Sequence, residues 1–220
     1  MNGTRLLRRV FALLLLLALI TGMTGCFTIT ISPRYVTLSD DYTTLTGTPD
    51  SEKVYRIEID NMSFTNSKDV TIDIAYSDTP SVEAVVSEDL LDYGFKITMN
   101  NGVLRVGPSK HLEIRTGRFE LKIRARLDEI DFSGGYDVTV DAGGAQSLSL
   151  NVSGAANGSV ENLYVSDFDA KISGAGSFVL SGAADKATIH ISGAGDIEAA
   201  GLTCNALDAK ISGAGDMTIA

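Results

Sequence analysis

A short motif of an apolar residue, serine and glycine, followed by alanine in every copy but the first, recurs at nearly constant spacing through residues 132–220. Copies begin at Phe132, Val152, Ile172, Ile191 and Ile211, which are separated by 20, 20, 19 and 20 residues. A near-constant period of this length is typical of proteins built from stacked repeats, in which each repeat contacts only its neighbours. The spacing therefore restricts residues 132–220 to a repetitive architecture.

Within each repeat, apolar and polar side chains alternate. In the fourth copy Ala187, Ile189 and Ile191 alternate with Thr188, His190 and Ser192. Alternation with a period of two predicts strands that bury one face, and three short strands joined by tight corners use about 20 residues. We therefore predict an all-β fold, in which the repeats form a right-handed parallel β-helix, or β-solenoid, with about 20 residues per coil.

Glycines occupy the expected corner of each coil. They are Gly154, Gly174, Gly193, Gly195, Gly213 and Gly215. Because glycine adopts positive φ at little cost, we expect left-handed backbone conformations at these corners. The preceding serines are Ser153, Ser173, Ser192 and Ser212. They are expected to form a hydroxyl ladder that bonds along the stack, and identical apolar rungs should stabilise a narrow interior.

Residues 52–131 alternate in the same way but lack the period, which predicts a more irregular β region before the coils. Asn101-Gly102 is a strong hairpin signal. The segment from Ser87 to Leu91, closed by Gly94, predicts one helical turn. Residues 52–220 are accordingly expected to form a single domain.

The amino terminus has the pattern of an export signal. Three arginines precede the eleven apolar residues Val10–Ile20, a run that is too short for a spanning helix of roughly 20 residues. Met23-Thr24-Gly25-Cys26 resembles the bacterial lipobox, which implies removal of a signal peptide (residues 1–25) and lipidation of Cys26. An ordinary cleaved signal or a retained anchor are the alternatives. The Ser/Thr-rich residues 26–51 are expected to be a tether, with a short strand near residues 35–38.

The chain is acidic, with 18 lysines and arginines, 28 aspartates and glutamates and a net charge of -10. This balance argues against nucleic acid as a partner and against electrostatic docking to anionic lipid. One basic cluster comprises Arg115, Arg118, Lys122, Arg124 and Arg126. It is a candidate site for an anionic surface polymer, and the alternative is a solvated strand face that balances nearby acids.

Asp196 and Asp216 follow the second corner glycine of two successive repeats, which makes them candidate metal ligands. Corner capping is the favoured alternative, because earlier copies have Asn157 and Ser177 there and calcium takes 6–8 oxygens. Cys204 has no partner cysteine once Cys26 is lipidated and is expected to pack as a small apolar residue. Without a nucleophile motif around the serines, we expect neither an enzyme nor a bound cofactor.

The segments ISGAGDI at Ile191–Ile197 and ISGAGDM at Ile211–Met217 resemble the head GIN domain family of auto-transporter adhesins. The likeness extends upstream through Asn101–Val106 and covers Val54–Ala220. It implies an exported bacterial protein with a β-helical fold and no catalytic residues.

We therefore expect a non-enzymatic lipoprotein on the outer face of the membrane or in the cell envelope, which binds a glycan or another surface protein. One alternative is a structural or sensory envelope lipoprotein that acts on a neighbouring membrane protein. A more remote alternative is a polysaccharide-active β-helix enzyme.

The final repeat is expected to need a cover. Met217–Ala220 bring no helix, proline or charge after Asp216, whereas terminal repeats normally carry a polar cap. Either an amino-terminal segment or a second molecule should cover this coil. We favour the second molecule, which would give a weak two-fold homodimer.

The lipid anchor leads to the first test. Cys26→Ser should release the protein from membranes and abolish labelling by a fatty-acid probe, because the serine hydroxyl cannot form the thioether and two acyl chains are needed for stable anchoring. Fractionation and probe labelling of cells measure both effects. Unchanged labelling of the Cys26→Ser variant would show that Cys26 is not the acylated residue.

Overall fold

The computed structural model describes residues 35–47, 54, 56–65 and 70–219. These residues belong to one compact unit, Arg34–Ala220. The expected signal peptide, Cys26 and residues 27–34 of the expected tether lie outside the described residues. Among the described residues, no helix has the length and apolar character needed to cross a membrane.

The fold is all-β, as predicted. The strands are β1 (Tyr35–Thr37), β2 (Tyr42–Gly47), β3 (Arg56–Ile59), β4 (Met62–Phe64), β5 (Val70–Tyr76), β6 (Ser81–Ser87), β7 (Lys96–Asn100), β8 (Val103–Gly107), β9 (Leu112–Thr116), β10 (Phe119–Ala125), β11 (Glu129–Phe132), β12 (Asp137–Asp141), β13 (Ser147–Val152), β14 (Asn157–Ile172), β15 (Ser177–Ile191), β16 (Asp196–Ile211) and β17 (Met217–Ile219). One short helix, α2 (Asp89–Asp92), follows β6.

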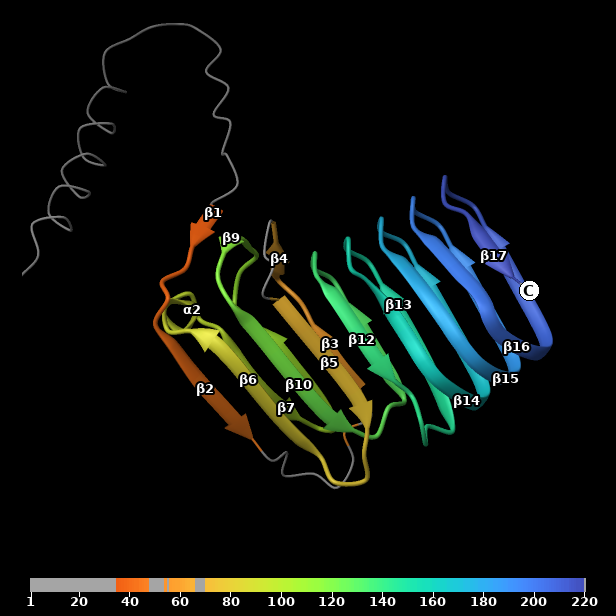
Figure 1. Cartoon of the computed structure of the whole chain (residues 1–220), viewed down its shortest axis with the longest axis horizontal. Coiled ribbons are helices and arrows are strands. Elements are labelled where there is room, and N and C mark those ends of the chain that lie inside the picture. The colour runs from red at the N-terminus through yellow and green to blue at the C-terminus, as the bar shows by residue number, and fades with distance from the viewer. Residues whose placement is uncertain (1–34, 48–53, 55, 66–69, 220) are drawn as a thin grey trace, which may run out of the picture. The chain divides into compact units, whose positions relative to one another are not determined.

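Most strands belong to one 14-stranded sheet that curls into an open half-barrel (Figure 1). One flank runs β2-β6-β10-β5-β12 and the other β13-β11-β3-β8-β7. The long strand β14 joins them, because residues 157–161 pair with β12 and residues 167–172 pair with β13. Strands β1, β9 and β4 form a separate three-stranded sheet. Apolar side chains of the curled sheet point inward and form the core.

Each repeat pairs in parallel with the repeat before it. Ile172 lies beside Val152 and Ile191 beside Ile172, and Ile211 in turn lies beside Ile191. The offset between paired residues therefore equals the spacing of the motif, so equivalent residues of successive repeats stack. The inward and outward alternation is also as predicted, since Ala187, Ile189 and Ile191 are buried.

The folded body begins earlier than the sequence indicated. Residues 35–47 were expected within a tether, but β1 pairs with β9 and β2 pairs antiparallel with β6. Val36 and Leu38 are buried. Strand β2 is half-exposed and rich in threonine, and a polar composition of this kind also occurs in linkers. Threonine is β-branched, however, and β-branched residues favour strands. The short strand expected near residues 35–38 is confirmed as β1.

Two local predictions are confirmed by backbone geometry. Asn101 and Gly102 have φ values of 48° and 78°, which suit the type I′ turn between the antiparallel strands β7 and β8. The helical turn α2 is closed by Gly94, whose φ is 79° and whose N–H donates to the carbonyl of Leu91 at 3.0 Å.

The interior is filled by side chains of unequal size, rather than by the identical rungs expected. Phe168 pairs in register with Leu148 on one side and Ala187 on the other. Phe178 lies beside Gly158, and its ring stacks on Phe132 with a centroid distance of 6.3 Å. A large ring beside a small residue keeps the interior densely packed along the stack.

The corner glycines permit close approach of main chains, and the expectation of positive φ at them is wrong. Gly154, Gly174, Gly193, Gly195, Gly213 and Gly215 lie at or beside the corners, yet none has positive φ. A Cβ on Gly174 would overlap the carbonyl oxygen of Gly154, and one on Gly193 would overlap that of Gly174. The corners are hydrogen-bonded to each other, for example from Ala175 N–H to Gly154 O at 3.0 Å.

Three of the four corner serines, Ser153, Ser173 and Ser212, donate their hydroxyls along the stack to carbonyl groups, where a serine-to-serine ladder was expected. Ser153 Oγ donates to Phe132 O at 3.4 Å, and Ser173 Oγ donates to Val152 O at 3.3 Å. The main-chain N–H of each serine donates to the same carbonyl at 2.8 Å. The hydroxyls therefore reinforce the main-chain ladder between repeats.

Close packing of the corners predicts a graded response to alanine. Gly174→Ala should lower the free energy of unfolding by about 1–3 kcal/mol, because its methyl group meets main chain on an inner repeat. Gly213→Ala should cost less, since the last repeat can shift outward. Gly47→Ala is the matched control, because nothing lies within 4 Å of its Cβ position. Urea unfolding measures all three, and equal stability of the Gly174 and Gly47 variants would contradict the close approach.

Candidate binding surface

Outward side chains of seven neighbouring strands form one continuous row, which we name the central row. It contains Arg105 on β8, Glu58 on β3, Asp131 on β11, Asn151 on β13, Lys171 on β14, His190 on β15 and Lys210 on β16. Adjacent members are paired in register, so they repeat at the strand spacing of about 4.8 Å. The corner serines form a second row two residues further along each repeat.

These two rows line a hollow of about 680 Å³. Six central-row residues contribute to it, from Glu58 at one end to Lys210 at the other, together with Arg56 and Asp60. Its floor includes Phe132, Val152, Ile172 and Ile191, which belong to the stacked strand ends. The hollow therefore runs across the strands, and its lining follows the repeat.

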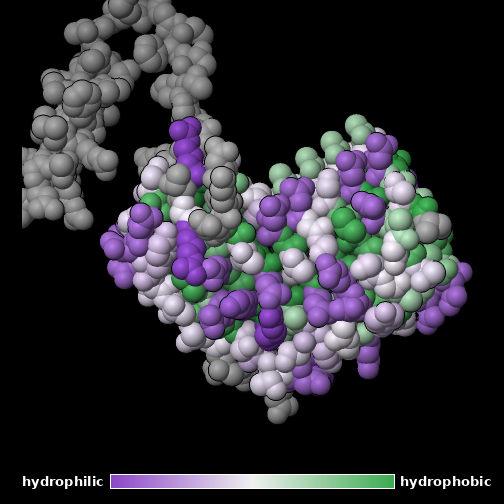
Figure 2. Space-filling model, in the orientation of Figure 1, coloured by the Kyte–Doolittle hydropathy of each residue, from purple (hydrophilic) through white to green (hydrophobic). Residues whose placement is uncertain are grey.

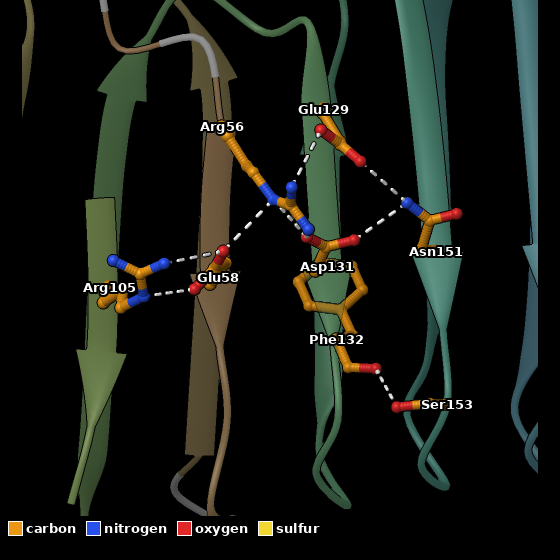
Figure 3. A network of polar contacts seen from close by, with 8 residues as sticks. All are labelled: Arg56, Glu58, Arg105, Glu129, Asp131, Phe132, Asn151 and Ser153. Atoms are coloured by element: carbon orange, nitrogen blue, oxygen red, sulfur yellow. Dashed lines mark hydrogen bonds and ion pairs between the residues drawn. The ribbon is translucent and has the colours of Figure 1, made fainter. Parts of the chain in front are cut away.

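Arg56 organises the end of the hollow nearest β3 (Figure 3). Its guanidinium group contacts Asp131 at 2.6 Å, Glu58 at 3.1 Å and Glu129 at 3.5 Å. The hydrogen bond to Asp131 raises the pKa of Arg56 above its usual value. One cation thus holds three carboxylates from two neighbouring strands.

Two further side chains extend this network (Figure 3). Arg105 donates to Glu58 at 3.2 Å, and the Asn151 amide donates to Asp131 at 2.8 Å and to Glu129 at 3.2 Å. The acids are therefore engaged with arginine and amide donors. This arrangement does not resemble a general acid facing a general base.

The opposite end of the central row is basic. Lys171 pairs with Asp169 on its own strand at 2.8 Å. Among the described residues, neither His190 nor Lys210 has a carboxylate within ion-pair distance. Charge therefore separates along the hollow, with acids and arginines near β3 and β11 and ammonium and imidazole donors on β14–β16.

The basic cluster predicted from the sequence does not form one patch. Arg115 lies on β9 in the small sheet, whereas Lys122 and Arg124 lie on β10 in the large one. Three arginines have carboxylate partners, namely Arg118 with Glu120 at 2.6 Å, Arg124 with Asp73 at 2.6 Å and Arg126 with Asp78 at 2.9 Å. Lys122 lies in register between Asp73 and Glu83.

The surface of this region agrees with those contacts. Figure 2 shows hydrophilic side chains distributed among paler ones over the face that carries β6, β10 and β5 in Figure 1. The structure thus favours the alternative of a charge-balanced strand face over an anion site.

Asp196 caps the next corner, whereas Asp216 takes part through its main-chain N–H. The Asp196 carboxylate accepts the main-chain N–H of Asp216 at 2.8 Å, just as the Asn157 side chain accepts the N–H of Ser177 at 3.0 Å. Within the part of the chain that the structure describes, no three His, Cys, Asp or Glu residues are placed to hold a metal ion. That no metal binds stays a prediction. Cys204 is half-buried and packs against the core.

The central row was missed in the sequence, although a signal for it was present. Asn151, Lys171, His190 and Lys210 each stand two residues before the corner serine. Residues two apart on a strand share a face. Aligning the repeats on their serines would have placed these four side chains beside one another, whereas charge clustering along the sequence pointed to the arginines of β10.

Asp60 gives the hollow a pH-dependent group. Burial raises the pKa of its carboxyl group, and the negative charge of Glu58 raises it further. Because the folded-state pKa exceeds the unfolded one, the folded state binds the proton more tightly. The free energy of unfolding should therefore fall as pH rises from about 3.9 through the raised pKa.

Asp60→Asn should remove this penalty while keeping an oxygen that accepts from Asn61, a contact of 3.1 Å in the structure. The variant should be more stable than the parent at pH 7 and similar to it at pH 3. Urea unfolding across this range measures the difference. A variant that is less stable than the parent at pH 7 would show that the ionised Asp60 carboxylate stabilises the folded state.

Solved structures of bacterial proteins share this fold. A crystal structure of a "putative adhesin" from Parabacteroides distasonis is 22% identical, with a TM-score of 0.53 and coverage of 84% of each chain. A second "putative adhesin", from Bacteroides fragilis, is 16% identical with a TM-score of 0.66, and the match covers 84% of this chain and 100% of that one. Identities this low show the fold alone. No curated protein matches the sequence.

The family resemblance seen in the repeats extends over most of the chain. The family model described as "Putative auto-transporter adhesin, head GIN domain" matches residues 63–220. The match spans all five copies of the motif and most of the described strands before them. The chain therefore belongs to the family described as "Putative auto-transporter adhesin, head GIN domain".

Proposed function

We propose that this chain is a non-enzymatic binding module on the bacterial cell surface, which holds an extended glycan or protein segment in the hollow of the central row. The observation that carries this function is the row itself, in which His190 and Lys210 point donors outward without a carboxylate partner among the described residues. Membership of a family named for adhesins agrees with it.

The chemistry of the hollow suits a ligand rich in hydroxyl, carbonyl or carboxylate groups. Lys171, His190 and Lys210 supply donors, and the corner serines line the same hollow. Because the donors of β14–β16 repeat at the strand spacing, an extended ligand lying across these three strands would meet a nitrogen donor at each of them. The acids near β3 are held by Arg56 and Arg105, which supports binding in preference to a polysaccharide-cleaving reaction.

The hollow depends on a repetitive frame, which we infer to be a right-handed parallel β-solenoid over residues 132–220, with about 20 residues per coil. The parallel pairing of β14, β15 and β16 supports this architecture, as does the stacking of their corners. Each coil would add one member to the central row and one to the serine row.

Export and a lipid on Cys26 would place this module at the membrane. The body begins at Tyr35, so only the eight residues 27–34 lie between it and Cys26. An extended chain of that length spans at most about 30 Å. The body would therefore stay near the membrane, which also supports the second candidate function, a structural or sensory lipoprotein that acts on a neighbouring membrane protein.

Binding can be tested with residues 34–220, which form a compact unit. Combined alanine substitution of Lys171, His190 and Lys210 should weaken glycan or protein binding by about tenfold or more, because it removes two ammonium donors and one imidazole donor from the hollow. Lys122→Ala is the matched control, as this exposed lysine lies on β10 outside the hollow. Glycan arrays and cross-linking on intact cells measure the two ligand classes.

The outcomes separate the candidates. A glycan bound by the parent and by Lys122→Ala, but not by the triple variant, supports the binding module. A single cross-linked membrane protein without glycan binding supports the second candidate. Equal binding by the triple variant and the parent contradicts the assignment of the hollow.

A further inference from the structure

The outer edge of β16 is open along most of its length. Strand β17 covers only residues 197–199, and among the described residues no other strand pairs with this edge. Leu207 and Ile211 are 40% and 44% exposed, whereas Ala187 and Ile191, one repeat earlier, are covered. Figure 2 shows hydrophobic side chains among polar ones at the right-hand end of the body, where β16 and β17 lie in Figure 1. Such an edge is a template for another strand.

The direction of the main-chain hydrogen bonds shows which N–H and C=O groups of this edge can bond to another strand. Ser212 N–H donates to Ile191 O at 2.8 Å, so residues in phase with Ser212 direct their main-chain groups toward β15. Directions alternate along a parallel strand, so Asp208 and Lys210 also bond toward β15. Leu207, Ala209 and Ile211 therefore direct N–H and C=O groups outward.

We propose that two copies of this chain pair antiparallel through the β16 edge, about a two-fold axis at Ala209. In this register Leu207 lies opposite Ile211 of the second copy, and both side chains continue the apolar interior. Asp208 lies opposite Lys210 of the second copy on the outward face, and symmetry repeats this pair. The outward-directed main-chain groups of Leu207, Ala209 and Ile211 meet outward-directed groups of the second copy.

Neighbouring registers lack this complementarity. With the axis at Asp208, the Asp208 carboxylates of the two copies would face each other. With the axis at Lys210, the two Lys210 ammonium groups would face each other in the same way. An axis at Leu207 puts Asp208 opposite Ala206 and Lys210 opposite Cys204. The register at Ala209 combines outward hydrogen-bonding groups, apolar contacts and opposite charges. Because Asp208 and Lys210 form non-hydrogen-bonded pairs there, their side chains approach most closely.

This pairing would join the polar surfaces of the two copies. Lys210 is the last member of the central row, and Asp208 of the second copy would continue that row across the axis. The inference rests on the edge and its charges, and holds whether or not the hollow binds a glycan.

Charge exchange tests the register directly. Sedimentation velocity of residues 34–220 should detect a concentration-dependent dimer. Asp208→Lys and Lys210→Asp should each raise its dissociation constant by about tenfold or more, because either change creates two like-charge contacts. The combined variant with both changes restores opposite charges across the axis and should return to within about threefold of the parent. Circular dichroism of each variant checks that the fold is retained.

A second variant tests the geometry without relying on charge. In a Cys204→Ser background, Asp208→Cys combined with Lys210→Cys should form a disulfide-linked dimer, because opposed Cα atoms in non-hydrogen-bonded pairs lie about 4.5 Å apart. Asp208→Cys alone should link poorly, since the two copies of residue 208 are offset by about 7 Å along the strands. A parent that stays monomeric at the highest attainable concentration, or charge exchange that fails to rescue, would overturn the proposal.

Discussion

Each corner of the repeat region lies directly against the corner of the repeat before it, with main chain touching main chain. Ala175 and Ala194 donate their N–H groups to the glycine carbonyls of the preceding corner, each at 3.0 Å. The hydrogen-bond ladder of the sheet thereby continues through the turns, and a side chain at Gly174 or Gly193 would separate the layers. Because a buried unpaired main-chain group is costly, this continuous ladder fixes both the spacing and the register of the repeats.

The polar surface follows from that register. Because the strands pair in parallel, each residue lies beside the residue at the same position of the neighbouring repeat. The central row forms in this way. Exposed ion pairs contribute only about 0–1 kcal/mol each, so the contacts of Arg56 and Arg105 matter mainly by orienting carboxylates. The frame is built from main chain and apolar packing, and His190 and Lys210, which have no ion-pair partner among the described residues, take no part in it.

Much of the fold could be predicted from the sequence, because it follows from patterns of residues that are close together in the chain. The motif spacing gave the stacking period, the alternation around Ile189 gave the buried face, and Asn101-Gly102 gave the hairpin. Several features were not predicted from the sequence, and three of them depend on tertiary contacts. The polar strand β2 has the composition of a linker, and only its pairing with β6 makes it part of the sheet. The corner glycines were interpreted as turn formers, although they permit close approach of main chains. The arginines near β10 were grouped because they are close in sequence, but Arg124 pairs with Asp73 from another strand.

Hydrogen exchange at the corner alanines tests the central claim most directly. Ala155, Ala175, Ala194 and Ala214 have exposed side chains, but their N–H groups are bonded to the preceding corner at 2.8–3.0 Å. Stacked corners should protect these amides to a degree comparable with the neighbouring strands, with Ala214 in the last repeat the least protected. Exchange of Ala175 and Ala194 at the rate of unstructured loops would show that the corners are not in contact and would contradict the continuous ladder.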